Sequence, residues 1–119
     1  MRKILTRVLR HLGLIRFDLT TRRIDRFPAN DEVTPGEMLI VESDGVRKWV
    51  CFKCPGGCKE KISLSLNQKR RPRWEISNDW FGRPTISPSI HQQNECGCHF
   101  WVRSGRVEWC PGGRPDRMQ

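Results

Sequence analysis

Hydroxyl, imidazole, carboxylate and thiol side chains gather within residues 84–101, PTISPSIHQQNECGCHFW. Ser87 and Ser89 flank a proline, which restricts the backbone and favours an extended segment with both hydroxyls on one face. A serine hydroxyl acts as a nucleophile at neutral pH only when a nearby base accepts its proton. His91 and His99 are the candidate bases, so this stretch is a candidate site for nucleophilic catalysis.

The two histidines differ in their surroundings. His91 is followed by three polar amide side chains, which predicts that it lies in solvent. His99 stands between a cysteine and Phe100-Trp101, so we expect the neighbouring backbone to hold its ring in place. The same pattern also fits a structural strand in which His99 is a core residue or a metal ligand. Spacing alone leaves these alternatives open.

Five cysteines have the spacing of a metal site. Cys54-Pro-Gly-Gly-Cys58 places two thiols on either side of a tight glycine turn, as in a zinc knuckle. Cys96-Gly-Cys98 and Cys110 supply further thiols, as in a zinc ribbon. We therefore expect one structural zinc ion, bound by four of these five cysteines.

Strand geometry reduces the number of candidate ligands but does not fix all four. Cys51 and Cys54 lie three residues apart in the apolar stretch WVCFKC, and side chains alternate along a strand. Cys51 is therefore predicted to be a buried apolar residue. A two-residue turn at Ser104-Gly105 sets Cys110 opposite His99, whereas a bulge reverses that placement, so the fourth ligand stays open.

The elements that must position these residues are mostly strands. Residues 33–54 read as a hairpin with an Asp-Gly turn, and residues 59–66 alternate like a half-buried strand. Residues 74–90 supply another strand pair, and residues 99–110 form a last hairpin. The expected fold is mostly β, a small zinc-ribbon-like β-hairpin domain with an N-terminal helix.

The N-terminal helix is predicted from apolar residues at helical spacing with basic residues on the opposite side. The apolar positions are Ile4, Leu5, Val8, Leu9 and Leu12. A helix that docks on the domain is the main interpretation, with a membrane-surface or transit segment as the alternative. The expected organisation is a helix and basic extension over 1–30, a zinc-stabilised β domain over 31–112 and a frayed tail over 113–119.

Composition limits the cellular compartment and the kinds of partner that suit this chain. The chain has 119 residues, of which 36% are hydrophobic, and no apolar run approaches the roughly 20 residues that a membrane span needs. Free thiols used as metal ligands are typical of a reducing compartment, so we expect a cytoplasmic protein. The net charge of +9 favours an anionic partner, and basic residues interleaved with tryptophans fit a nucleic-acid surface as well as a solvated basic one.

Four segments resemble a small bacterial family long filed as a domain of unknown function: KWVCFKCPGGCKEKISLSL, RRPRW, GRPTISPSI and CGCHFWVRSGRVEWC. Members of that family occur in phages and in antiphage operons beside ubiquitin-like, ubiquitin-activating and ubiquitin-conjugating proteins. The resemblance implies a zinc-supported serine peptidase that processes or deconjugates the ubiquitin-like protein. Ser89 and His99 match the family motif, whereas the positions of Ser87 and His91 look interchangeable in it.

Two hypotheses follow from the sequence. In the first, Ser89 and His99 form a catalytic dyad whose partners are the ubiquitin-like protein, its conjugates and the operon's activating and conjugating enzymes. Glu95 and Glu108 are close enough in sequence to orient His99, and nothing distinguishes them. In the second, the chain is a non-catalytic zinc-ribbon module that binds nucleic acid or the conjugation enzymes, and the serines are structural.

Overall fold

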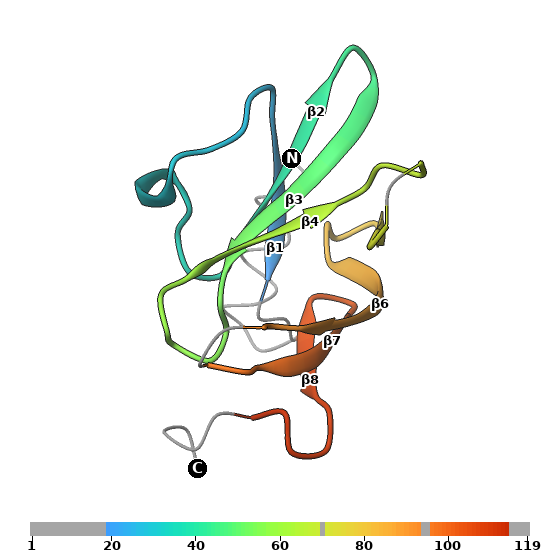
Figure 1. Cartoon of the computed structure of the whole chain (residues 1–119). Helices are drawn as coiled ribbons and strands as arrows, with labels where there is room; N and C mark the ends of the chain where they lie inside the picture. The colour runs from blue at the N-terminus through green and yellow to red at the C-terminus, as the bar shows by residue number, and fades with distance from the viewer. Residues whose placement is uncertain (1–18, 70, 94–95, 115–119) are drawn as a thin grey trace.

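Two four-stranded sheets packed on each other form the body of the protein (Figure 1). This computed structural model describes residues 19–69, 71–93 and 96–114. The strand order is β1-β2-β3-β4 in the first sheet and β5-β6-β7-β8 in the second. The mostly β fold predicted from the sequence is confirmed, while the expected N-terminal helix lies outside the described residues.

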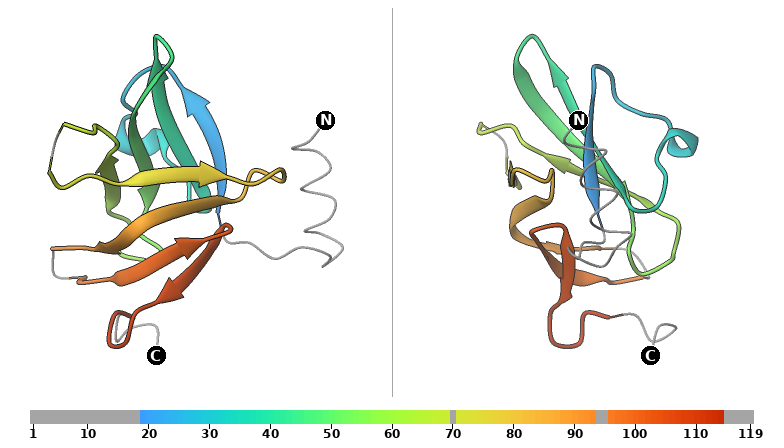
Figure 2. Two further views of the ribbon diagram at one scale, coloured as in Figure 1. Left: turned by 90° about the vertical axis from the view of Figure 1, so that its right-hand side faces the viewer. Right: turned by 180° about the vertical axis from the view of Figure 1, so that it is seen from behind.

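Each sheet is built from consecutive segments of the chain. The strands are β1 (Thr20–Ile24), β2 (Glu37–Ser43), β3 (Val46–Lys53), β4 (Lys61–Ser65), β5 (Glu75–Asn78), β6 (Pro84–His91), β7 (His99–Arg103) and β8 (Arg106–Trp109). A short 3-10 helix, η1 (Asn30–Glu32), lies between β1 and β2. Figure 2 shows the second sheet, in yellow to red, lying across one side of the first.

Two tight turns set the register of the hairpins. Asp44 and Gly45 connect β2 to β3 with φ angles of 54° and 74°, and Ser104 and Gly105 connect β7 to β8 with 49° and 76°. Positive φ at both central residues matches the right-handed twist of the flanking strands. Both hairpin turns are therefore where the sequence predicts them, and the last one has two residues.

β1 shows that the sheet begins before Asp31, inside the segment assigned from sequence to a basic extension. Its residues Thr20–Ile24 pair in parallel with Glu37–Val41 of β2. The backbone N–H of Leu19 also donates to the carbonyl of Gly105 in the second sheet, at 2.9 Å. A short strand of sequence TTRRI has no alternation of apolar residues, so periodicity gives no signal for it.

The core lies between the two sheets. Its most deeply buried members are Met38, Ile40, Val50 and Phe52 from the first sheet and Ile86, Ile90, Phe100 and Val102 from the second. Phe52 and Phe100 meet edge to face, with ring centroids 6.2 Å apart and an interplanar angle of 84°. β3 ends just before Cys54 and Cys58, and β7 begins just after Cys96 and Cys98. The ring contact between these two strands is therefore close in sequence to the candidate metal ligands.

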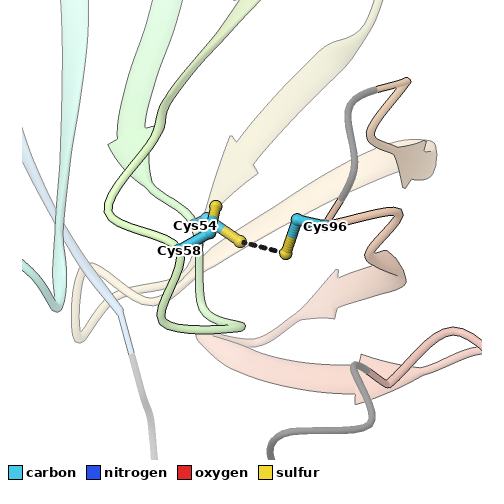
Figure 3. A group of neighbouring side chains, drawn as sticks. All are labelled: Cys54, Cys58 and Cys96. Atoms are coloured by element: carbon cyan, nitrogen blue, oxygen red, sulfur yellow. Dashed lines mark hydrogen bonds between the residues drawn. The ribbon is translucent and has the colours of Figure 1, made fainter.

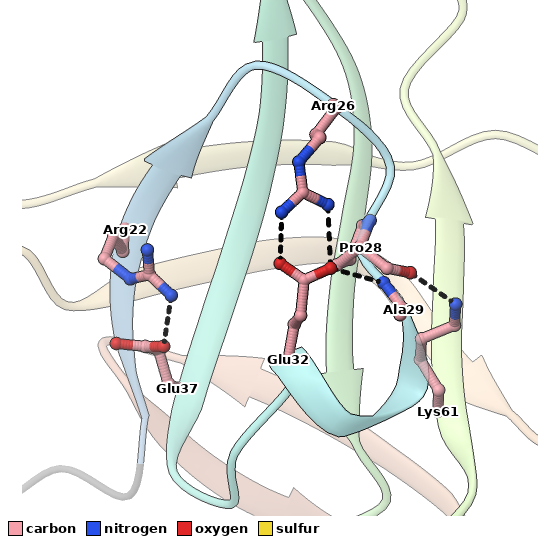
Figure 4. Close-up of polar contacts among 7 residues, drawn as sticks. All are labelled: Arg22, Arg26, Pro28, Ala29, Glu32, Glu37 and Lys61. Atoms are coloured by element: carbon pink, nitrogen blue, oxygen red, sulfur yellow. Dashed lines mark hydrogen bonds and ion pairs between the residues drawn. The ribbon is translucent and has the colours of Figure 1, made fainter.

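The connection between β1 and β2, residues 25–36, is held by an ion pair (Figure 4). Both guanidinium nitrogens Nη1 and Nη2 of Arg26 donate to Glu32, at 2.7 and 2.6 Å, and the Ala29 N–H donates to the same carboxylate at 3.0 Å. These hydrogen bonds lower the pKa of Glu32 to about 2. Val33 follows at the end of this turn and is buried.

We expect Phe52→Ala and Phe100→Ala each to lower the free energy of unfolding by about 3–5 kcal/mol, because each removes a fully buried ring. Since the rings touch, the double variant should lose less than the two single losses added together. Urea unfolding of the four proteins measures both quantities. Additive losses would show that the edge-to-face contact contributes nothing beyond burial.

Candidate functional site

A bulge in β6 presents the serines. Ile86 pairs with Val102 and Ile90 with Phe100, so β6 has three residues between these pairs where β7 has one. The three residues between the paired isoleucines, Ser87-Pro88-Ser89, therefore lie opposite Trp101 alone. Bulges bend a strand and re-aim its side chains, often beside active sites.

The bulge brings the hydroxyl of Ser89 to the ring of His99. Ser89 Oγ lies 3.1 Å from His99 Nε2, within hydrogen-bond distance, and both residues are half-buried. With the ring proton on Nδ1, the Nε2 lone pair accepts the hydroxyl proton. The two residues that the sequence analysis paired as nucleophile and base are thus in contact.

The alternative serine and histidine have different surroundings. Ser87 is exposed and pairs with Glu75 of β5. In the sheet, β5 lies on the side of β6 that faces away from the strand of His99. His91 is exposed, as predicted, and lies directly opposite His99 in the β6–β7 register. The two imidazole rings stack, with centroids 4.6 Å apart and an angle of 20°. His91 therefore contributes a stacking contact to the face of the candidate base.

Ser89 is also held by a hydrogen bond from Trp74. The indole N–H donates to the Ser89 carbonyl at 3.3 Å, and the Trp74 backbone N–H donates to Ser65 of β4 at 2.8 Å. Trp74 also lines a groove of about 820 Å³ that continues along β3 past Arg47 and Trp49. Trp74 therefore both forms part of the groove wall and holds the backbone of Ser89, the candidate nucleophile.

No carboxylate contacts the ring of His99 in the part of the chain that the structure describes. Glu108 lies opposite Trp101 and accepts a hydrogen bond from Arg103 at 3.0 Å. The Arg103 guanidinium in turn lies 4.5 Å above the Trp101 ring. Glu95, the other acid considered from sequence, lies outside the described residues.

Cysteines that follow β3 and precede β7 converge in space. The sulfur atoms of Cys54, Cys58 and Cys96 all lie within 4.8 Å of one another (Figure 3). Cys98 joins them, with its sulfur 3.4 Å from Cys54 and 3.1 Å from Cys96. The loop after β3 and the segment before β7 thus bring four of the five candidate ligands together.

The surroundings of these thiols suit a metal ion. Sulfur atoms bound to one zinc ion at about 2.3 Å in a tetrahedron lie about 3.8 Å apart, close to the 3.7 Å between Cys54 and Cys96. The Gly56 N–H donates to the Cys54 sulfur at 3.3 Å, which stabilises negative charge there. Burial raises the pKa of Cys54 to about 11 and also raises that of Cys98, so a bound cation would have to displace their protons. This cluster can hold a metal ion.

The remaining two cysteines lie apart from this cluster. Cys51 is fully buried, and its thiol contacts the Ser63 hydroxyl at 3.6 Å. Its burial confirms the prediction from strand alternation. Cys110, offered from sequence as a possible fifth candidate, does not join the cluster among the described residues. The two-residue turn sets it opposite His99, and its backbone N–H donates to the His99 carbonyl at 2.9 Å.

A comparison with protein families decides what kind of protein carries this site. The model for the bacterial ubiquitination-like system serine protease, BubE, matches residues 23–110. The chain belongs to this family. The BubE match spans both Ser89 and His99 and every cysteine of the chain, and it confirms the family inferred from the sequence motifs. No curated protein and no solved structure matched the chain.

Within residues 19–69, 71–93 and 96–114, no helix has the length and apolar character that crossing a bilayer requires.

Sequence reasoning missed three residues that hold the site. Gln92 accepts a hydrogen bond from the Cys54 thiol at 2.8 Å, Trp74 holds the Ser89 carbonyl, and Gly113 accepts one from the His99 N–H at 3.0 Å. Glutamine after a histidine carries no particular signal. Gly113 is part of a second Cys-Pro-Gly-Gly sequence, and that repetition is the one signal that the sequence offered.

We expect Cys54→Ala to lose the bound metal ion and Cys51→Ala to keep it, because only the first removes a sulfur from the cluster. Elemental analysis of the purified proteins gives the metal content per chain, with the wild type as reference. Both variants remove one buried thiol, so Cys51→Ala is a matched control for the loss of packing. Equal loss of metal from both would contradict the assignment.

Proposed function

We propose that the protein is a zinc-stabilised serine peptidase that cleaves the bond at the C-terminal end of a bacterial ubiquitin-like protein. Membership of the BubE family supports the reaction class and the setting in a ubiquitination-like system. The 3.1 Å contact between Ser89 Oγ and His99 Nε2 carries the assignment of the reacting residues. Release from an extended precursor and release from a conjugate both break an amide bond after the same tail, so one site serves either reaction.

In the acylation step, Ser89 Oγ attacks the carbonyl carbon while His99 Nε2 takes the hydroxyl proton. The tetrahedral intermediate collapses when His99 returns that proton to the leaving amine, and the acyl group remains on Ser89 as an ester. A water molecule then attacks the ester, His99 takes its proton, and Ser89 is released with that proton. Each proton passes through one ring nitrogen, so no second base is needed.

Ring orientation in this dyad rests on neighbouring groups of the fold. In a triad, a buried carboxylate selects the tautomer and orients the imidazole. Here the His91 ring stacks on one face of the His99 ring. Hydrogen bonds to the His99 backbone fix the position of its Cα, from which the side chain extends. Among the described residues, these contacts would orient the ring.

The metal ion has a structural role in this proposal. Cys54, Cys58, Cys96 and Cys98 would hold a zinc ion, and four thiolate ligands leave no open position for a water molecule. Zinc bound there would tie the loop after β3 to the segment before β7. Because Cys98 precedes His99, this tie fixes the start of the strand that carries the base.

A place in antiphage defence is part of the same proposal, since the sequence motifs resemble operon-borne members. The ubiquitin-like protein and its conjugates are then the substrates, and the activating and conjugating enzymes are neighbours in the pathway. We further propose a cytoplasmic setting, because the proposed thiolate ligands need a reducing compartment.

Ser89→Ala and His99→Ala should each abolish cleavage, with losses of at least about 10²-fold, because each removes one half of the proton transfer. The substrate is the ubiquitin-like protein of the same operon with a short C-terminal extension, and intact mass measures its shortening. The double variant should be scarcely worse than either single one, because the two residues act as a unit.

Ser87→Ala is the matched control, since it removes the same hydroxyl from the same bulge without touching His99. It should retain activity, and all variants should retain metal and melting temperature. An active Ser89→Ala protein would contradict the peptidase and favour a binding module. Nucleic-acid affinity that falls steeply with salt would then identify that module's partner.

A further inference from the structure

The sequence Cys-Pro-Gly-Gly occurs twice, and its second copy has no part in the cysteine cluster. The first copy, residues 54–57, carries the ligand candidate Cys54. The second, residues 110–113, begins with Cys110 directly after β8. In both copies the last glycine N–H donates to the cysteine carbonyl, at 3.2 and 2.8 Å, so each closes a tight turn. The second turn therefore needs a different explanation.

This second turn holds the backbone of His99 at both polar groups. The N–H of His99 donates to the Gly113 carbonyl at 3.0 Å, and the carbonyl of His99 accepts from the Cys110 N–H at 2.9 Å. The first and last residues of the turn thus bond one residue of β7. On the other side of His99, the Cys98 carbonyl accepts from the Gln92 N–H at 2.8 Å.

Gly113, which the sequence analysis assigned to the frayed tail, is buried instead, and its approach to His99 leaves no room for a side chain. A Cβ at position 113 would lie 2.1 Å from the carbonyl oxygen of His99 and 2.9 Å from its Cβ. The oxygen belongs to the backbone, so no change of rotamer relieves the clash. Any side chain at this position must push the peptide of His99 away from the turn.

We propose that Gly113 is a positioning residue for catalysis, which sets the place of the His99 ring relative to Ser89 through this backbone contact. The proposal rests on the proposed dyad. A hydrogen bond of 3.1 Å tolerates little displacement, and misplacement of a catalytic group by about 1 Å can lower a rate about 10²-fold. Gly113 lies beyond residues 23–110, so the match to the BubE family does not include it.

Gly112 offers a matched control inside the same turn. It has a φ of 73°, which a residue with a side chain adopts only with strain, yet a Cβ there would meet open space. Gly112→Ala therefore strains the turn without reaching His99. Comparing Gly112→Ala with Gly113→Ala separates a general loss of stability from displacement of the base.

The experiment compares the full-length wild type, Gly112→Ala and Gly113→Ala on the extended ubiquitin-like protein. Gly113→Ala should lower kcat about 10²-fold with KM within about twofold, because the substrate surface is unchanged while the base is displaced. Gly112→Ala should lower the melting temperature by about 5 °C and keep kcat within about twofold of the wild type. Both should retain the metal ion. Equal kcat in Gly113→Ala and the wild type, or equal losses in both variants, would overturn the proposal.

A second readout does not depend on activity. The chain has three histidines, so the ring carbon–proton signals of His99 can be assigned by NMR with His11→Gln and His91→Gln variants. Gly113→Ala should move the His99 signals, and Gly112→Ala should leave them in place. If Ser89→Ala proves active, the dyad fails, but this NMR comparison still tests whether Gly113 positions the ring.

If Gly113→Ala does not fold, one glycine inserted before Gly113 serves instead. The insertion adds no side chain and lengthens the turn after Cys110, so it moves the Gly113 carbonyl away from the His99 N–H without a clash. It should lower kcat and move the His99 signals as Gly113→Ala does. A fully active insertion variant would overturn the proposal.

Discussion

The convergence of four thiols from two sheets is the constraint on which the rest of the site depends. Cys54 and Cys58 follow the longest strand of the first sheet, and Cys96 and Cys98 precede β7 of the second. Small domains gain much from such ties, because their cores alone bury limited apolar surface. His99 comes directly after Cys98, so the position of the cysteine cluster also limits where the candidate base lies.

Much of the scaffold follows from local rules that the sequence displays. The Asp-Gly and Ser-Gly pairs fix two hairpins, and the period of two separates buried Cys51 from Cys54 in the cluster. The register of the last hairpin then places Cys110 opposite His99, as a two-residue turn requires. β1 could not be found in this way, because a polar edge strand takes its pairing from the partner strand and shows no period of its own.

The candidate site was harder to predict, because it depends on long-range geometry. Nothing in Ser-Pro-Ser states which hydroxyl faces a base, and the preference for Ser89 came from the resemblance to a family. The structure provides the physical reason, since the bulge brings Ser89 to His99 while Ser87 pairs with β5. The supporting contacts of Trp74 and Gln92 join residues 15 and 38 positions apart, beyond any local pattern.

The size of the β6 bulge has a consequence for how such a site is gained or lost. β6 exceeds β7 by two residues between the paired positions, and two is the period of side-chain alternation in a strand. Ile86 and Ile90 therefore both face the core, although the serine segment stands between them. Deleting Pro88 and Ser89 would leave Ser87 alone opposite Trp101, restore a regular ladder with the same core, and remove the hydroxyl that contacts His99. A short deletion can thus remove the candidate nucleophile while the paired core residues on either side keep their places.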